Sequence, residues 1–312
     1  MNNSITIYEP KRNNSLTVYK ENLDLFFRFV TERQNIFYKR FVEKLPQPWT
    51  NDEILRKYKF TNVYRELDRG TLYVKNEIIG RGKPEDVIFN ILIYRIFNKI
   101  ESHRAIGFQH VSNFDADKIY RTLKKIEDSR KPVFTNAFMV SGAKYGGYEK
   151  KLPNMVYGVI QNDIVRNFDR YFYGIINSKS LEEAHSVIKS ITHFGDFLAY
   201  EAVIDINYSG IIKFSEDDWV NAGPGCRRGL DYIFKCKDAF SYADLIKILR
   251  EDQRFHFERL GLHFKFWHGN DLTLRNVEHS LCEFSKYYRL LTGADTRIRK
   301  FKQSEENLKI KA

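Results

Sequence analysis

Two adjacent aspartates, Asp217 and Asp218, are well placed in this sequence for acid–base chemistry. A carboxylate can accept a proton from a substrate group or stabilise positive charge that develops during a reaction. The same pair follows Ser215 and Glu216, an order that is also typical of a helix N-terminus, with serine as cap and acids beside the positive end of the dipole. We predict that Asp217 or Asp218 is catalytic, with a capped helix start as the alternative.

A glycine-rich turn with two arginines follows, running from Gly223 to Arg228 as Gly-Pro-Gly-Cys-Arg-Arg. Free amides at a helix start and guanidinium groups both bind anions. Arginine in a first helical turn opposes the dipole, so a phosphate ligand explains its position better than helix stability does. We predict a phosphate or pyrophosphate site made by Gly223, Gly225, Arg227 and Arg228; a plain connector between helices is the alternative.

The segment from residue 48 to residue 69 alternates aromatic and polar residues densely. If residues 62–78 form one helix, several of its polar side chains lie on one side and make a polar pocket. An ordinary salt-bridged surface is the alternative. The candidates are Asn62, Arg65 and Arg69 as substrate ligands, with Asp68 on the same side, and Glu66 as a catalytic carboxylate.

Polar residues also recur at helical spacing near the C-terminus, from Glu278 to Tyr287. We predict Glu283 as a further catalytic carboxylate, and Lys286 and Tyr287 as substrate contacts. His279 and Cys282 are one turn apart, as a cysteine nucleophile and its histidine base would be. A cysteine on an apolar helix face usually belongs to the core, and we favour that interpretation.

Residues 187–203 have the spacing of two helices joined by a tight hairpin, with apolar Ile191 and Phe194 around the turn and the small Ala199 in the second helix. A hairpin of this kind directs backbone N–H groups at a DNA phosphate. The first turn glycine is replaced by His193, which keeps the turn only with a negative φ or with tolerated strain. We predict that His193 and Gly195 contact DNA.

Apolar residues recur at helical spacing along most of the chain, and clean alternation of apolar and polar residues is scarce. Helices must therefore position the groups described above. The sequence therefore predicts an all-α fold. We expect an N-terminal extension at 1–18, one helical unit at 19–295 that splits into two lobes near 141–153, and a charged tail at 296–312. The expected helices are 19–43, 51–59, 62–78, 84–100, 114–128, 155–174, 180–190, 194–207, 225–235, 241–258 and 271–291.

The balance of charge indicates an anionic partner. The chain has 51 Lys and Arg against 40 Asp and Glu, a net charge of +11, which favours nucleic acid; a role in solubility alone is the alternative. Lys144, in the glycine- and lysine-rich loop 141–153, is a further candidate DNA contact. Three cysteines at wide spacing indicate neither a disulfide framework nor a zinc site. We expect an intracellular protein, cytoplasmic or DNA-associated, with no membrane partner, no metal and no cofactor.

The hairpin and the region after it resemble the helix-hairpin-helix superfamily of DNA glycosylases. In that superfamily a catalytic aspartate follows the last hairpin glycine at a distance similar to that of Asp217 and Asp218, which follow Gly195 by 22 and 23 residues. The resemblance implies a glycosylase-like helical fold. It also implies that the aspartate acts on a base flipped out of duplex DNA.

Three longer blocks, 57–69, 223–230 and 281–287, are similar to the helical domain of 5-hydroxymethyluracil DNA kinases. That family includes the α-glutamyl/putrescinyl thymine pyrophosphorylases, also described as amino acid:DNA transferases. The resemblance runs from about residue 20 to 295. It implies thymine hypermodification, in which an amine or amino-acid co-substrate attacks a flipped-out, activated 5-hydroxymethyluracil and pyrophosphate leaves. The glycine-arginine turn would then hold the pyrophosphate, and Asp217 or Asp218 would deprotonate the amine.

Other functions stay open at this point. Gly80-Arg-Gly-Lys-Pro84 lacks the first glycine and the final Ser or Thr of a Walker A loop, so we do not expect kinase activity. A DNA glycosylase that excises a modified base, or a DNA-binding module without catalytic activity, would use the same hairpin. The sequence thus predicts a DNA-modifying transferase, with a glycosylase as the second choice.

Overall fold

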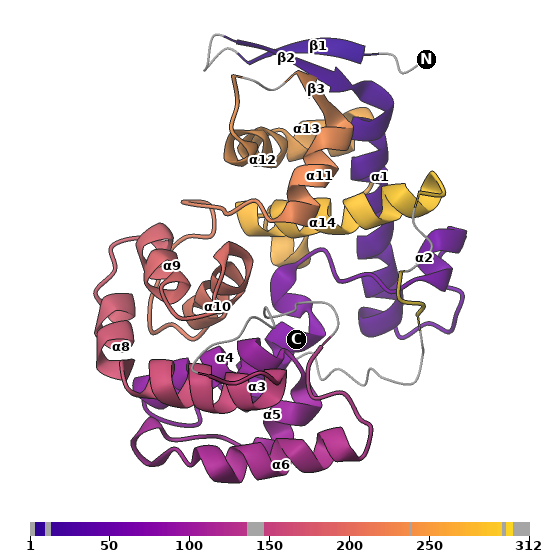
Figure 1. Ribbon diagram of the computed structural model, residues 1–312. Helices are drawn as coiled ribbons and strands as arrows, with labels where there is room; N and C mark the ends of the chain where they lie inside the picture. Colours follow the sequence, from indigo (N-terminus) through magenta and orange to yellow (C-terminus); the bar gives the residue numbers. More distant parts are fainter. Residues whose placement is uncertain (1–3, 10–13, 136–146, 237–238, 295–297, 302–312) are drawn as a thin grey trace. The chain divides into compact units, whose positions relative to one another are not determined.

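The computed structural model describes residues 4–9, 14–135, 147–236, 239–294 and 298–301. Helices dominate these residues, and the strands form one small sheet (Figure 1). The predicted all-α fold class is therefore confirmed. The chain forms two compact units, Met1–Asp68 with Trp219–Ala312 and Arg69–Asp218, which we call the first and the second unit.

The first unit is built around two long helices, α1 and α14, and the shorter α11 that packs on both. Because β2 leads directly into α1 and β3 directly follows α11, the sheet extends the two helices at one end (Figure 1). The elements are β1 (Ser4–Glu9), β2 (Asn14–Tyr19), α1 (Lys20–Phe37), the π-helical η1 (Tyr38–Val42), α2 (Glu53–Lys57), the 3-10 turn η2 (Arg65–Leu67), α11 (Pro224–Ile233), β3 (Phe234–Cys236), α12 (Tyr242–Glu251), α13 (Gln253–Arg259), the 3-10 turn η5 (Trp267–Gly269) and α14 (Leu274–Leu291).

Part of the predicted N-terminal extension is a β-hairpin. Strand β1 pairs antiparallel with β2, with Ile5 opposite Val18, and β2 pairs antiparallel with β3. Leu16 and Val18 are each 1% exposed and separated by one residue, the period of a strand with one face in the core. Six residues with this alternation are a weak signal in the sequence, and the partner β3 lies more than two hundred residues away.

The second unit is helical in its described residues. Helix α4 is its buried centre, since every residue from Asp86 to Phe97 is buried, and α10 packs against it. The elements are α3 (Arg69–Glu77), α4 (Pro84–Phe97), α5 (Ile100–Ile106), the 3-10 turn η3 (Val111–Asn113), α6 (Ala116–Asp128), α7 (Lys151–Pro153), the π-helical η4 (Asn154–Val165), α8 (Phe168–Ile176), α9 (Leu181–Lys189) and α10 (Asp196–Tyr208).

Several predicted helices are interrupted, among them those expected at 84–100 and 241–258. The one expected at 84–100 ends at Phe97, because Asn98 takes the left-handed conformation with φ 44°, and α5 then begins at Ile100. The one expected at 241–258 is divided at Asp252 into α12 and α13. In both cases the break is a local change of backbone conformation that helical periodicity does not register.

The boundaries between the units differ from the predicted lobe boundary. The chain leaves the first unit after Asp68 and returns to it at Trp219, so the second unit is an insertion in the sequence of the first. The predicted boundary near 141–153 falls inside the second unit, and residues 136–146 of it lie outside the described residues. Across the described ranges, every helix is too short or too polar to cross a membrane.

Candidate functional site

The predicted hairpin lies in the second unit, where α9 and α10 pack against each other and are joined by a tight turn. His193 takes φ 67° in this turn, so it occupies the left-handed conformation for which a glycine is preferred. The turn is held by hydrogen bonds from the Thr192 N–H to the Asp163 carboxylate (2.7 Å) and from the Phe194 N–H to the Ile191 carbonyl (2.9 Å). The strain expected for a histidine at this position is therefore present.

The two predicted DNA contacts of the hairpin are both partly accessible. Gly195 is exposed at the N-cap of α10, and His193 is half-buried. Partial burial lowers the pKa of His193 below its usual range. At the start of α10, Asp196 forms an ion pair with Lys189 (2.6 Å).

Asp217 and Asp218 lie in a turn that precedes no helix. The Asp217 N–H donates to the Ser215 hydroxyl (3.1 Å), and the Asp218 N–H donates to the Ser215 carbonyl (3.2 Å). The next helix, α11, begins only at Pro224, so the alternative of a capped helix start at Ser215 is wrong. Asp217 is half-buried and Asp218 is exposed, so both carboxylates lie where solvent or substrate can reach them.

The glycines of the predicted phosphate site are needed for packing in the first unit. A Cβ on Gly225 would overlap the Cys282 sulfur, and a Cβ on Gly229 would overlap the Leu281 carbonyl oxygen, so α11 and α14 approach each other through backbone. The Gly223 N–H donates to the buried Glu278 carboxylate (3.2 Å). The structure thus accounts for Gly223 and Gly225 by contacts within the unit.

The two arginines of this turn are exposed. The Arg227 guanidinium donates to the Ala222 carbonyl (2.8 Å) and lies 5.5 Å from the centre of the Tyr242 ring. Arg228, one residue further along α11, is also exposed and is a second candidate for an anion contact. A phosphate site at Arg227 and Arg228 stays a prediction.

The segment 62–78, predicted as one helix, is broken at Asp68. The Asp68 carboxylate accepts from the Asn62 N–H (2.8 Å), and the Asn62 amide donates to the Leu67 carbonyl (2.8 Å). Short polar side chains that bond nearby backbone in this way compete with helix formation. Arg69, expected on the same helix face, begins α3 in the second unit and pairs with Glu101 (3.0 Å).

Asp68 is the centre of a buried group in the first unit that we call the Asp68 cluster, composed of Asn62, Arg65, Asp68, Asn276 and His279. An Asp68 carboxylate oxygen lies 2.9 Å from the His279 Nε2 and 3.4 Å from the Arg65 guanidinium. The Asn276 side chain accepts from the Arg65 N–H (2.8 Å). The structure therefore brings together two segments that the sequence singled out separately, 62–68 and the start of α14.

Burial of Asp68 raises its pKa, but the charges of His279 and Arg65 and the Asn62 N–H outweigh this and hold the pKa below its usual range. If Cys282 were a nucleophile, His279 would be its base. The Nε2 of His279 instead lies against the Asp68 carboxylate. Burial and the nearby Glu278 raise the pKa of the other thiol in the same region, Cys226. A buried thiol with a raised pKa is a core residue and not a nucleophile.

The lowered pKa of Asp68 predicts acid-sensitive stability of the first unit. The ionised Asp68 carboxylate stabilises the folded unit fully above the unfolded-state pKa of about 3.9, and this stabilisation is lost as the pH falls through the pKa of the folded state. Asp68→Asn should lower the free energy of unfolding by about 1–3 kcal/mol near neutral pH, since it weakens a buried charged pair. The difference between variant and wild type should shrink towards low pH, as measured by urea unfolding followed by tryptophan fluorescence. The exposed Glu258→Gln, also in the first unit, is the control, and a difference that does not change with pH would contradict the prediction.

The remaining predicted residues of α14 hold the loop before the Asp68 cluster. The Glu283 carboxylate accepts from the Thr61 N–H (2.9 Å) and pairs with Lys286 (2.6 Å). The Lys286 ammonium also donates to the Lys59 carbonyl (2.8 Å). Glu283 and Lys286 therefore position the loop, and Glu66, in the 3-10 turn η2, is half-buried.

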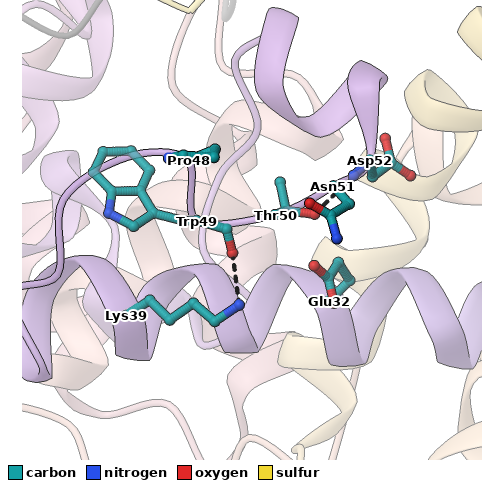
Figure 2. Close-up of a pocket in the computed structure, with 7 residues that line it drawn as sticks. All are labelled: Glu32, Lys39, Pro48, Trp49, Thr50, Asn51 and Asp52. Carbon is teal, nitrogen blue, oxygen red and sulfur yellow. Dashed lines mark hydrogen bonds between the residues drawn. The ribbon is translucent and has the colours of Figure 1, made fainter.

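A pocket of about 410 Å³ opens in the first unit between α1 and residues 48–52 (Figure 2). Figure 2 shows the Trp49 ring and the carboxylates of Glu32 and Asp52 towards opposite ends. Asp52 accepts hydrogen bonds from the Leu55 N–H (2.9 Å) and from the Tyr287 hydroxyl (2.6 Å). The lining residues are Glu32, Lys39, Pro48, Trp49, Thr50, Asn51 and Asp52.

Tyr287 links this pocket to α14, which also carries the predicted site residues Glu283 and Lys286. Burial and the hydrogen bond to Asp52 raise the pKa of Tyr287, so the phenol stays protonated and donates. The sequence predicts Tyr287 as a substrate contact; in the structure its hydroxyl donates to Asp52, which lines the pocket, and Tyr287 itself is not a lining residue. Glu32 on α1 and Lys39 on η1 were missed, because the dense alternation after Pro48 signals only one side of the pocket and these two residues reach it through the fold.

The family model of the 5-hmdU DNA kinase helical domain matches residues 20–295. The chain belongs to this family. A 5-hmdU DNA kinase of Bacillus phage SP10 is 32% identical over 288 residues, which cover 85% of this chain and 44% of the relative. The chain therefore spans less than half the length of that relative. No solved structure matches the chain.

The family match confirms the resemblance to the helical domain of 5-hydroxymethyluracil DNA kinases. It includes the α9–α10 hairpin, the Asp217–Asp218 turn, the α11–α14 contact and the Asp68 cluster. Of the predicted site residues in this helical domain, Asn62, Arg65, Glu283, Lys286 and Tyr287 lie in the first unit around α14. His193, Gly195, Asp217 and Asp218 lie in the second unit, and Lys144 lies outside the described residues.

Proposed function

We propose that this chain binds DNA that contains 5-hydroxymethyluracil and modifies the hydroxymethyl group. The observation that carries the proposal is the family match over residues 20–295, with a relative that is named a 5-hmdU DNA kinase. The net charge of +11 supports a polyanionic substrate. The name of the relative favours phosphoryl transfer from a nucleoside triphosphate to the hydroxymethyl oxygen, in contrast to the expectation drawn from the missing Walker A loop.

We further propose that α9 and α10 form a helix-hairpin-helix that contacts a DNA phosphate through the turn at His193 and Gly195. The tight turn and the exposed start of α10 support this proposal. A base flipped out of the duplex would then be held in the glycosylase-like manner that the sequence suggests. Asp217 and Asp218 follow the hairpin in the position of the glycosylase aspartate.

Amine transfer to an activated 5-hydroxymethyluracil, with release of pyrophosphate, is the second candidate. The observation that favours it is the pair of carboxylates, Glu32 and Asp52, in the pocket of a protein that is otherwise strongly basic. Carboxylates attract an ammonium group, so this pocket suits an amine or amino-acid co-substrate. Arg227 and Arg228, which also belong to the first unit, would bind the pyrophosphate.

Mass spectrometry of nucleosides from treated DNA tests both reactions. The chain is incubated with duplex DNA containing 5-hydroxymethyluracil and a nucleoside triphosphate, and separately with the pyrophosphorylated base and an amine. We expect a phosphorylated nucleoside in the first reaction; an amine adduct in the second would support the second candidate. Abasic, alkali-labile sites would indicate a glycosylase. Binding without any product would indicate a DNA-binding module and would overturn both proposals.

The proposed role of the aspartates predicts the effect of removing their charge. Asp217→Asn with Asp218→Asn should lower the rate of modification by about 10²-fold or more, the usual contribution of a positioned proton-transfer group. DNA affinity should not fall, because the neutral amides remove two negative charges that repel phosphate. Gel-shift titration and nucleoside mass spectrometry measure the two effects. Glu216→Gln, in the same turn, is the control, and unchanged activity of the double variant would remove the pair from the mechanism.

A further inference from the structure

Helix α6 presents a row of three cations to solvent. It packs on α5, α7 and η4, and its Ile119 and Leu123 are only 1% and 0% exposed. Lys118, Arg121 and Lys125 are all exposed, and their spacing of three and four residues places them on one side of the helix, opposite the buried side chains. Figure 1 shows α6 at the edge of the second unit. We call these three residues the α6 cation row.

The three acidic residues of α6 have other partners and do not neutralise the row. Asp117 accepts a hydrogen bond from the Tyr157 hydroxyl of η4 (2.9 Å). Glu127 and Asp128 both pair with Lys124, the first at 3.6 Å. In the part of the chain that the structure describes, the α6 cation row forms no ion pair and no side-chain hydrogen bond. Its three charges are therefore available to an anionic partner.

The row lowers the stability of its own helix when no ligand is bound. Lys118 lies in the first turn, after the cap Asp115, where a positive charge opposes the helix dipole. Arg121 is three residues from Lys118 and four from Lys125, and like charges at both spacings repel. A polyanion bound along the row relieves both effects. The arrangement is therefore explained better by binding than by helix stability.

The length of the row matches a nucleic-acid backbone. At a rise of about 1.5 Å per residue, Lys118 and Lys125 lie about 10 Å apart along the helix axis. One strand of duplex DNA carries a phosphate about every 3.4 Å along the duplex axis, so the row spans about three phosphate intervals. Arg130 and Lys131, directly after α6, are also exposed and add positive charge at its end. Long cationic side chains in a line suit phosphates, which position a protein on DNA, more than base edges.

The second unit also carries the hairpin for which we propose a DNA contact. Helix η4 contacts both elements, since Tyr157 bonds to α6 and Asp163, further along η4, accepts from the Thr192 N–H of the hairpin turn (2.7 Å). One helix thus holds the α6 cation row and the hairpin turn in a fixed relation within the unit. Duplex DNA is therefore the polyanion to which we assign the row.

We propose that the α6 cation row is a second DNA-binding surface of this unit, which contacts phosphates of duplex DNA and reads no base. The inference rests on the proposed function, in which the chain binds DNA that contains 5-hydroxymethyluracil. Cations that contact phosphates release the counterions of the DNA. The row therefore strengthens binding equally on every sequence and makes the affinity depend on salt.

Neutralising the row tests this role. Lys118→Gln, Arg121→Gln and Lys125→Gln together should weaken binding to duplex DNA by about 10-fold or more at about 0.1 M salt, measured by fluorescence anisotropy. The slope of log K against log salt concentration should become shallower by about 2–3, which is about 0.9 for each lost phosphate contact. The loss should be equal for duplexes with thymine and with 5-hydroxymethyluracil. The midpoint of thermal unfolding should not fall, because the variant removes repulsion between cations.

A second triple variant of the same unit is the matched control. Arg81→Gln, Arg104→Gln and Lys124→Gln remove the same charge from cations that are already paired with carboxylates, and should change the affinity and the slope much less.

Equal losses in the two triple variants, or an unchanged affinity and slope of the row variant, would overturn this inference alone. A lower unfolding midpoint of the row variant would also overturn it, since the row would then stabilise the fold, as would a loss confined to 5-hydroxymethyluracil DNA, since the row would then read the base. A wild type that does not bind duplex DNA would overturn the proposed function, and with it the partner assigned to the row.

Discussion

Arg95→Met should lower the free energy of unfolding of the second unit by about 3–5 kcal/mol, because it leaves two buried carboxylates without their counter-charge. Arg95 is 1% exposed on α4 and pairs with Asp205 (2.6 Å) and Glu201 (3.3 Å) on α10. Methionine keeps much of the side-chain volume, so the loss reports charge more than packing. Hydrogen exchange of α4 and α10 amides measures the opening free energy of this unit.

A variant without any of the three charges shows whether such a loss comes from unpaired buried charge or from lost packing of the arginine side chain. Arg95→Met combined with Glu201→Gln and Asp205→Asn removes the unpaired charges and should regain part of the stability lost by Arg95→Met alone. Tryptophan fluorescence should report little of either change, because Trp49, Trp219 and Trp267 all belong to the first unit. A loss below about 1 kcal/mol for Arg95→Met would show that the carboxylates are solvated or protonated in the folded unit.

Gly229→Val should destabilise the first unit by about 3 kcal/mol, at the upper end of the range for overpacking. Any side chain at this position on α11 meets the backbone carbonyl of Leu281 on α14, and a carbonyl within a helix cannot move aside as a side chain can. The two helices must therefore separate. Urea unfolding followed by tryptophan fluorescence measures the effect, since the indoles lie in this unit.

The neighbouring Arg228→Ala is the matched control for this substitution. Arg228 is exposed on the same helix, so its truncation should change stability by no more than about 0.5 kcal/mol. If Arg228 binds phosphate, the same variant should weaken DNA or pyrophosphate binding without loss of stability. Gly229→Val with wild-type stability would mean that α11 and α14 do not approach each other this closely in solution.

The glycine-arginine turn shows where a motif in the sequence has two explanations. Glycine followed by arginine at a helix start is typical of an anion site, and the same pattern arises where a helix must approach its neighbour through backbone. The contacts of Gly225 and Gly229 with α14 and of Gly223 with Glu278 account for the glycines. Anion binding is then a proposal for the arginines alone, and Arg228 is the residue that tests it.

The all-α fold class, most helix positions and the family could be predicted from the sequence alone. These properties are recorded locally, in the 3.6-residue period of apolar side chains and in blocks such as 57–69 and 281–287 that need no partner to be recognised. It also singled out the hairpin at His193 and the segment after Pro48, which contributes to the pocket. Each of these signals lies within a short stretch of chain.

Which of these residues contact one another depends on the tertiary structure. Asp68 interrupts the expected helix at 62–78 because its carboxylate is used by Asn62, Arg65 and His279, and the last of these is two hundred residues away. The division into units, the partner of β2 and the side of the pocket formed by α1 likewise depend on contacts distant in sequence.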